Sequence, residues 1–466
     1  MQFVIPLHRI PHRVLVSIEA FFALAISYMM RFCTSIALTE MTKPTKSIKD
    51  STCNITTSSF LKPLDKLYDF NWSARDISFL QSSFFAGYAL SMIPSGILAD
   101  KIGFKTPVVV GLLISGLSTV LQPFFAYHHG VWGMILLRFI LGMAQGLFYA
   151  ALHTMVAEWV PKKERSVLGT IIFSGLYIGN AINFSCSGNI LWFFKGSWPI
   201  LFYLYGSSGI FIGVIFLFTT YNRPEDNPYL KPKEKKLLTE HINSMKLLKP
   251  EQKNTPCVAI MTNNPVWSIS IAMFGHNWCL FLMITALPTF ISAVLNYNSQ
   301  QNGLINASIH LIIWVAGILS GVLCDYAVKK RIVSLTMNRK IGATLASIMP
   351  SVGILLSAYT RCNRLASIVL IAVGTFFMGC FYPTLKMNPI DIAQNFAGTI
   401  GAMAHFCGAL AGILVTLFTT QFTPNNSMDE WKGVFWICFI IMSLTNMHYI
   451  IFASADIQTF DTMQKK

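Results

Sequence analysis

Long apolar segments alternate with short polar segments along almost the whole chain. Between residues 14 and 454, predominantly apolar stretches follow one another about twelve times, each roughly 20 residues long, which is enough to cross a hydrocarbon core about 30 Å thick as a helix. Within a bilayer, helices and closed barrels are the structures that satisfy every backbone hydrogen bond. The pattern therefore predicts an all-α polytopic membrane protein with about 12 transmembrane helices.

The longest polar interruption, at 222–264, divides these segments into two sets of six. We predict an N-terminal six-helix bundle at 1–220, a central cytoplasmic linker at 221–264, a C-terminal bundle at 265–454 and a cytoplasmic tail at 455–466. The linker is expected to be partly helical around 232–245. The predicted spans are 14–37, 77–97, 107–125, 131–160, 167–194, 199–220, 266–293, 303–326, 341–359, 366–385, 396–418 and 434–453.

Composition excludes a soluble globular protein of this size, because 53% of the residues are hydrophobic, 12% are charged and the mean hydropathy is +0.54. The formal net charge of +15 would suggest a nucleic-acid partner in a soluble protein. Here the Lys and Arg residues lie mostly in short connections, where they set the orientation of membrane spans. The expected surroundings are therefore the lipid bilayer, with no nucleic acid.

Glycosylation sequons orient the chain. Asn54 in the loop 40–72 and Asn425 in the last outward connection lie in N-x-S/T motifs, which are useful acceptors only on the lumenal or extracellular side. The basic segment PKKER at 161–165 falls on the opposite side. The N-terminus is therefore predicted to be cytoplasmic, and the absence of an acidic dileucine signal there favours the plasma membrane over lysosomes or vesicles.

One short motif occurs twice, after the second span of each bundle. GILADKIGFK at 96–105 contains Gly96, Asp100, Gly103 and Lys105, and GVLCDYAVKKR at 321–331 places Asp325 where Asp100 stands in the first copy. Internal repeats of this kind build many secondary transporters, which hold their substrate between the halves near the bilayer midplane. Because both aspartates lie at cytoplasmic helix ends, we expect them to orient or gate the helices rather than bind a ligand.

Two arginines, Arg31 and Arg138, lie inside predicted spans. A charge at the bilayer centre costs from about 3 to over 10 kcal/mol, so an intramembrane arginine is a functional hypothesis by default. Counted from the span ends, the two lie at similar depth and could form bidentate hydrogen bonds to a carboxylate or phosphate. The alternatives are a structural ion pair with an acid, or snorkelling to the interface.

Further polar residues lie within the spans. Gln145 follows Arg138 by seven residues, which is about two helical turns on nearly the same face. His153 is a candidate proton relay, and His276 with Asn277 a candidate pathway lining, whereas packing is favoured for His310 and His405. No cysteine and histidine spacing predicts a metal site, no phosphate loop is present, and no catalytic constellation stands out, so an enzyme is not expected.

At the level of the fold, the repeated loop resembles the signature of the major facilitator superfamily. More specifically, the chain resembles the anion transporters of solute carrier family 17. The resembling segments are RFCTSIALTEM at 31–41, the stretch 68–100, EWVPKKERS at 158–166, GSWPILFYLYGSSG at 196–209, HNWCLFLMITALPTFI at 276–291 and IDIAQNFAGTIGAM at 390–403. This resemblance implies anion transport, with the family's arginines falling on Arg31 and Arg138 and its span 2 tyrosine on Tyr88.

This chain departs from the sequence pattern of the family in two respects. Proton-coupled members carry an acid where this chain has Gln145, and an amide cannot carry a proton at physiological pH. The family's glutamate carriers have a histidine and an arginine that fall on Gln81 and His276, which argues against glutamate as the substrate. The phosphate and organic anion branch of the family resembles this chain in having a glutamine at the position of Gln145.

We therefore predict a secondary active transporter that moves a small anion by alternating access. Sodium-dependent cotransport of inorganic phosphate or an organic anion is the first choice, with Na⁺ as a co-transported ion and no cofactor. Proton-coupled export of acidic sugars or amino acids from lysosomes or vesicles is the alternative. A channel and a membrane receptor or scaffold are the competing classes. Continuous ion current without saturation would distinguish a channel from a carrier, and uptake in proteoliposomes would exclude a receptor or scaffold.

Overall fold

The computed structural model describes residues 11–41, 69–161, 164–194, 196–246, 256–295, 297, 299–360, 363–424 and 427–462. Within these residues, eleven helices are long and apolar enough to cross a membrane. One of them, α3 (Lys105–Trp159), contains Gly130 at φ +61° and ψ −148°, where the chain reverses so that Gly111 packs against Ala144 and Phe148 of the same element. Because α3 provides two crossings, the described chain has the twelve spans that the sequence predicts.

The remaining bounds follow chain order. In the N-terminal half they are α1 (His12–Met41), α2 (Ala74–Ile102), α4 (Arg165–Phe193) and α5 (Pro199–Thr219). The connecting region holds η3 (Pro224–Asp226), α6 (Pro232–Lys246) and α7 (Cys257–Met261). The C-terminal half holds α8 (Asn264–Phe281), η4 (Leu282–Ala286), α9 (Leu287–Ala293), α10 (Ser299–Lys329), α11 (Leu335–Ser357), α12 (Arg364–Phe376), η5 (Phe377–Phe381), η6 (Tyr382–Lys386), α13 (Asn388–Ile392), α14 (Ala397–Phe422), α15 (Met428–Phe452) and α16 (Thr459–Thr462).

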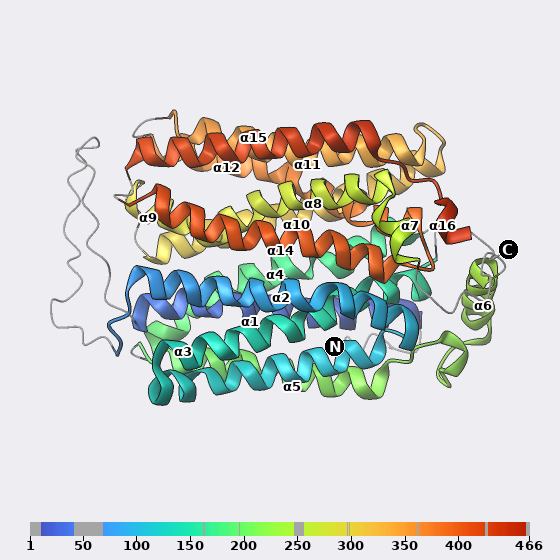
Figure 1. Cartoon of the computed structure of the whole chain (residues 1–466), viewed down its shortest axis with the longest axis horizontal. Helices are drawn as coiled ribbons and strands as arrows, with labels where there is room; N and C mark the ends of the chain where they lie inside the picture. The colour runs from blue at the N-terminus through green and yellow to red at the C-terminus, as the bar shows by residue number, and fades with distance from the viewer. Residues whose placement is uncertain are drawn as a thin grey trace, which may run out of the picture.

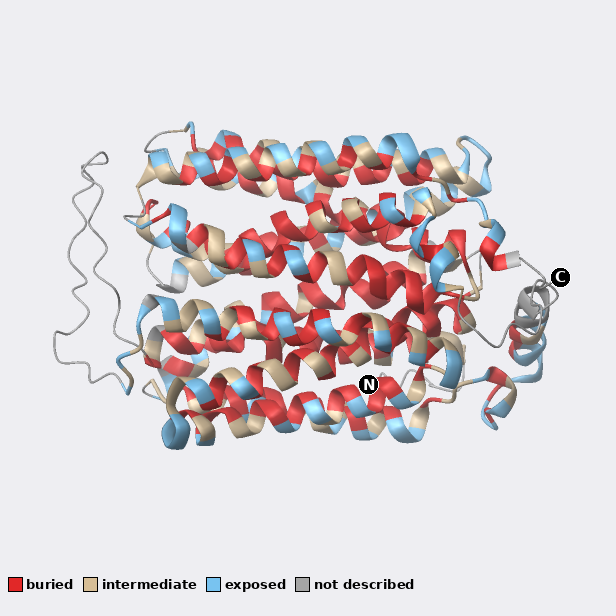
Figure 2. Ribbon diagram, viewed as in Figure 1, coloured by how far each residue is buried: buried red, intermediate tan, exposed pale blue. Residues whose placement is uncertain are grey.

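The two sets of spans form two bundles that lie side by side, with α1–α5 in one and α8–α15 in the other (Figure 1). Across the interface α2 packs along α14, and α4 packs along α10. Buried residues concentrate where the bundles meet, while the outer helices expose much of their surface (Figure 2). On α5, for example, Phe211 is 65% and Phe218 72% exposed, as expected for side chains that face lipid.

Glycines allow the closest helix contacts. A Cβ on Gly142 of α3 would lie 2.1 Å from the Phe84 carbonyl oxygen of α2, and one on Gly179 of α4 would lie 2.2 Å from that of Ala25 in α1. Small residues at helix interfaces let backbones approach in this way. Gly142 and Gly179 therefore have a packing role.

Two spans of the C-terminal half are not regular α-helices. The seventh span contains the π-helical segment η4 ahead of Pro288, and the tenth contains 3₁₀ and π-helical segments, η5 and η6, around Pro383. Proline removes a backbone donor, and π segments in helices are often found at functional sites. The tenth span runs from Arg364 to Ile392, so its predicted end at residue 385 was seven residues too early, and Lys386 lies inside it.

The two repeated aspartates join the bundles at the ends that the sequence predicts to be cytoplasmic. The Asp100 carboxylate accepts hydrogen bonds from the Gly398 and Thr399 backbone N–H groups at 3.1 and 2.8 Å, and from the Thr399 and Thr154 hydroxyls at 2.8 Å each. Asp325 of α10 accepts the Val167 backbone N–H at 3.2 Å. Each carboxylate thus lies at the positive N-terminus of a helix in the opposite bundle.

The glycines and lysine of the first motif shape the same region. Gly96 lies against α14, where a Cβ would be 2.6 Å from the Gly398 carbonyl oxygen. Gly103 has a φ of +89° and lies beside Asn222, whose side chain accepts the Lys105 backbone N–H at 2.8 Å. Gly96 therefore allows close packing against α14, and Gly103 and Lys105 shape the turn beside Asn222.

The connecting region and the tail also contact the bundles. In the predicted linker helix, which is present as α6, Glu234 forms an ion pair with Arg13 of α1 at 3.1 Å. In the tail, Asp461 accepts the backbone N–H groups of Gln394 and Asn395 just before α14. The predicted glycosylation sites Asn54 and Asn425 lie outside the described residues and stay predictions.

Candidate functional site

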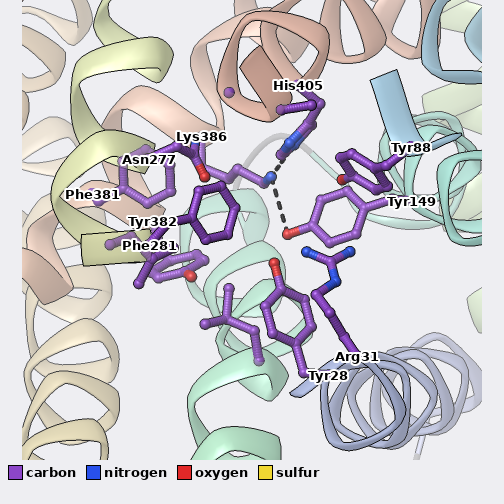
Figure 3. A pocket seen from close by; sticks show the side chains of 14 residues that line it. Tyr28, Arg31, Tyr88, Tyr149, Asn277, Phe281, Phe381, Tyr382, Lys386 and His405 are labelled. Atoms are coloured by element: carbon purple, nitrogen blue, oxygen red, sulfur yellow. Dashed lines mark hydrogen bonds between the residues drawn. The ribbon is translucent and has the colours of Figure 1, made fainter. Parts of the chain in front are cut away.

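A small cavity lies between the bundles, and the two halves contribute its walls together (Figure 3). Its volume is about 10 Å³, which leaves room for at most one water molecule. The lining residues are Tyr28, Arg31, Tyr88, Tyr149 and Leu176 from the N-terminal half, with Asn277, Leu280, Phe281, Phe381, Tyr382, Lys386, His405, Gly408 and Ala409 from the C-terminal half. This lining contains one arginine, one lysine, one histidine and four tyrosine hydroxyls, but no Asp or Glu.

Arg31 reaches the cavity from α1 and is 1% exposed. Its Nε donates to Gln145 Oε1 at 3.0 Å, and its guanidinium carbon lies 4.4 Å from the ring centroids of Tyr28 and Phe84 and 4.8 Å from that of Tyr88. One terminal nitrogen has no hydrogen-bond partner among the described residues. Aromatic faces and an amide hold this cation, and no carboxylate of the described chain pairs with it.

Arg138 is buried next to Arg31, but it does not line the cavity. Its Nη1 donates to the Arg31 backbone carbonyl at 2.6 Å. Gln145 lies deeper on the same face, where its Nε2 donates to the Ser27 carbonyl at 2.8 Å. These two contacts show that α1 and the second crossing of α3 run antiparallel, with the two arginines at similar depth as predicted.

The guanidinium carbons of Arg31 and Arg138 lie 4.4 and 5.3 Å from the ring centroid of Phe84, but only Arg31 lines the cavity, so the expected paired clamp stays a prediction. Side chains of a helix lean toward its N-terminus. Because the two helices run in opposite directions, Arg31 leans toward Gln145 while Arg138 leans the opposite way, toward the carbonyl end of the Arg31 residue. Only Arg31 faces the cavity, and Arg138 supports its backbone. Direct substrate contact by Arg138 stays a prediction.

Lys386, in η6, is the second cation of the cavity, and the sequence analysis missed it. It is 1% exposed, its Nζ donates to the Tyr149 hydroxyl at 3.3 Å, and it forms a short contact with His405 Nε2. The ammonium also lies 4.4 and 4.6 Å from the ring centroids of Tyr149 and Phe173. The available sequence signal is a lone lysine between apolar residues, but the predicted span at 366–385 ends one residue before it.

The histidines are placed differently from expectation. His405 lines the cavity, although packing was the favoured role, and Asn277 lines it as predicted. His276 instead stacks on Phe381, with ring centroids 3.5 Å apart and planes 2° apart, and does not line the cavity. His153 is buried behind the cavity, with its ring 5.5 Å from that of His405, so neither His276 nor His153 reaches the space in this conformation.

Tyr88 lines the cavity, as its place in the predicted site requires, and three further tyrosines accompany it. Tyr28, Tyr149 and Tyr382 were missed because a tyrosine in an apolar span is ordinarily a packing residue. Rings of Tyr28 and Tyr88 lie 6.4 and 6.2 Å from that of Tyr149. Their hydroxyls provide donors that an anion accepts from.

One buried ion pair lies close to this region. Arg339 Nε of α11 donates to Asp391 Oδ2 of α13 at 2.8 Å, with side chains 3% and 7% exposed. Arg339 also forms a short contact with the Pro383 carbonyl, within the π-helical segment that carries Lys386. The pair therefore holds the irregular part of the tenth span, and it engages the acid that is nearest to Lys386 in sequence.

A model of the Major Facilitator Superfamily matches residues 20–416 of the chain. Among curated relatives, the uncharacterized transporter slc-17.2 of Caenorhabditis elegans is 30% identical, over 96% of this chain and 92% of the relative. Human sialin is 28% identical over 95% and 90%. Sodium-dependent phosphate transport protein 3 of mouse is 29% identical over 84% and 81%. The chain belongs to solute carrier family 17 of the major facilitator superfamily.

Solved structures agree on the fold of this solute carrier. The proton:xylose symporter XylE has a TM-score of 0.71 to it and 14% sequence identity, over 97% of both chains. The all-α, two-bundle class predicted from the sequence is therefore confirmed, as is a multi-pass membrane transporter rather than an enzyme. The cavity lies where such a transporter holds its substrate, between the two halves.

Proposed function

We propose that this solute carrier is a secondary active anion transporter, and that it cotransports inorganic phosphate or an organic anion with sodium. One observation carries the proposal: the cavity between the bundles is lined by two buried cations and no Asp or Glu. A desolvated cation without an acid is costly, and a bound anion relieves that cost. The similarity to proteins named for phosphate transport and to sialin supports the same class.

Alternating access supplies the mechanism. With the cavity this small, the bundles must separate before an anion can enter between Arg31 and the tyrosine hydroxyls. Arg31 offers a planar fork that matches a carboxylate or phosphate, and Arg138 fixes the Arg31 backbone or meets the anion in an open state. The Asp100 and Asp325 contacts hold the predicted cytoplasmic end closed, so their release would open the access route at that end.

Gln145 supports sodium rather than protons as the coupling ion at this position. Its amide is engaged at both ends, by Arg31 and by the Ser27 carbonyl, and it has no titratable proton near neutral pH. The plasma membrane is the proposed location. The similarity to sialin favours one second candidate, proton-coupled export of acidic sugars or amino acids from lysosomes or vesicles.

Uptake into proteoliposomes tests both candidates. Radiolabelled phosphate, urate, sialate and glutamate would be offered one at a time, with sodium, pH and voltage gradients imposed separately. We expect sodium-driven, saturable uptake of phosphate or urate. Sodium-independent sialate uptake driven by a pH gradient would instead establish the second candidate, and no saturable uptake of any of the four would contradict anion transport.

Two variants test the site in the same assay. Charge-assisted hydrogen bonds contribute about 1.5–3 kcal/mol, so Arg31→Ala should lower uptake at limiting substrate by about 10- to 100-fold. Arg138→Ala should also lower it, through misplacement of Arg31. Normal uptake by either variant, at equal protein in the liposomes, would make that residue dispensable.

A further inference from the structure

The two cations of the cavity come from opposite bundles. Arg31 belongs to α1 and Lys386 to η6, and both side chains point into the same space (Figure 3). Tyr149 lies between them. Its hydroxyl accepts a hydrogen bond from Lys386 Nζ at 3.3 Å, and its ring centroid lies 6.4 Å from that of Tyr28. The Arg31 guanidinium carbon in turn lies 4.4 Å from the Tyr28 ring centroid. The cavity therefore holds one positive group from each half.

Within the described chain, neither cation has a carboxylate partner. Lys386 contacts a tyrosine hydroxyl, a histidine nitrogen and two aromatic faces. The nearest acid in sequence, Asp391, is bound by Arg339 at 2.8 Å. Like charges brought together in a desolvated site repel strongly, so two such cations at one cavity indicate a ligand that supplies the negative charge.

We propose that Lys386 is a second anion-binding residue and that the site selects anions with two negative charges, held between Arg31 of one bundle and Lys386 of the other. This inference rests on the proposed function and deepens it. Hydrogenphosphate and short dicarboxylates have the required chemistry. The arginine fork binds one end bidentately, and the lysine ammonium, a compact point charge, binds the other.

The arrangement also explains how a substrate could favour closure. With no anion bound, bringing the bundles together places the two cations at one cavity without counter-charge. A dianion neutralises both and contacts both bundles, so it stabilises the closed state more than the open one, which is the condition for a ligand to shift the equilibrium. A monoanion neutralises one cation and leaves the other uncompensated.

His405 is a positioning residue in this scheme. Its Nε2 faces Lys386 Nζ, so it accepts the lysine hydrogen bond only as a neutral imidazole with its proton on Nδ1. The aromatic faces of Tyr149 and Phe173 hold the same ammonium. These contacts direct Lys386 toward the other bundle rather than toward the Arg339–Asp391 pair.

The test uses two carboxylates of equal carbon number, succinate with two charges and butyrate with one, together with inorganic phosphate. Competition of each against radiolabelled phosphate would be measured at pH 7.5 in proteoliposomes that contain the full chain. We expect wild type to bind succinate and phosphate more tightly than butyrate. Lys386→Gln and Lys386→Met should weaken succinate and phosphate about 10- to 100-fold and change butyrate little.

Controls separate charge from structure. Lys386→Arg should keep the preference for two charges, and Lys432→Gln, which removes a surface lysine paired with Asp429, should change nothing. If Lys386→Gln weakens succinate and butyrate equally, or leaves succinate unchanged, the inference is wrong while anion transport stands. If wild type takes up none of the anions, the proposed function itself fails.

Discussion

The two halves of the molecule treat their buried arginines in opposite ways. In the C-terminal half, Arg339 forms an ion pair with Asp391 at 2.8 Å, and both side chains are almost fully buried. In the N-terminal half, Arg31 is equally buried, but amide and aromatic groups surround it and no carboxylate of the described chain pairs with it. A paired cation is already neutralised by the protein, whereas an unpaired cation facing a cavity remains available to a ligand.

Replacing Arg339 and replacing Arg31 should therefore change the free energy of unfolding by different amounts. Removing one partner of a buried pair leaves an uncompensated charge and typically costs 3–5 kcal/mol. Removing an unpaired cation takes away a charge that the fold holds at a cost, so stability is preserved although function is lost. Stability and transport measurements on matched variants can therefore separate the two kinds of site.

Arg339→Ala should give the largest effect on stability. It leaves Asp391 buried without a counter-charge and frees the π-helical segment around Pro383, so we expect a loss of about 3–5 kcal/mol. The measurement is the thermal unfolding midpoint in detergent, with the folded yield from size-exclusion chromatography. Arg339→Ala combined with Asp391→Ala should recover part of the loss, and a double variant no better than the single one would show that the pair is not what stabilises this region.

Arg31→Met should have a much smaller effect on stability. The methionine keeps much of the side-chain volume among Tyr28, Phe84 and Tyr88, and the variant loses one hydrogen bond to Gln145, which contributes about 1 kcal/mol. Loss of the buried charge offsets that cost, so we expect an unfolding midpoint within a few degrees of wild type, while uptake at limiting substrate falls about 10- to 100-fold as for Arg31→Ala. A midpoint as low as that of Arg339→Ala would show that Arg31 is a structural residue.

Much of this architecture follows from sequence because it depends on local patterns. The spans follow from apolar run lengths, and the repeat that carries Asp100 and Asp325 is visible as two similar segments. Arg31 and Arg138 stand out because a charge in an apolar run is rare and costly. Burial of both arginines at similar depth could thus be predicted without any tertiary information.

The missed features depend on side-chain direction or on contacts distant in sequence. Depth along a span predicts the level of each arginine, but side chains of antiparallel helices lean in opposite directions, so Arg31 donates to Gln145 whereas Arg138 donates to the Arg31 carbonyl. The predicted span ends at residue 385, whereas the π-helical segment η6 continues the membrane crossing through Lys386, which an apolar run length does not predict. The Arg339–Asp391 pair joins residues 52 positions apart, and no local pattern indicates which cation an acid will bind.

Breaking an exposed ion pair should have the smallest effect on the unfolding midpoint. Lys432 Nζ donates to Asp429 Oδ1 at 2.8 Å, but the two side chains are 34% and 89% exposed. Water already solvates both groups, so such a pair contributes at most about 1 kcal/mol. Lys432→Gln should therefore shift the unfolding midpoint by less than Arg31→Met does and leave uptake unchanged. If it lowered the midpoint as much as Arg339→Ala, burial would not be what distinguishes the charged contacts of this transporter.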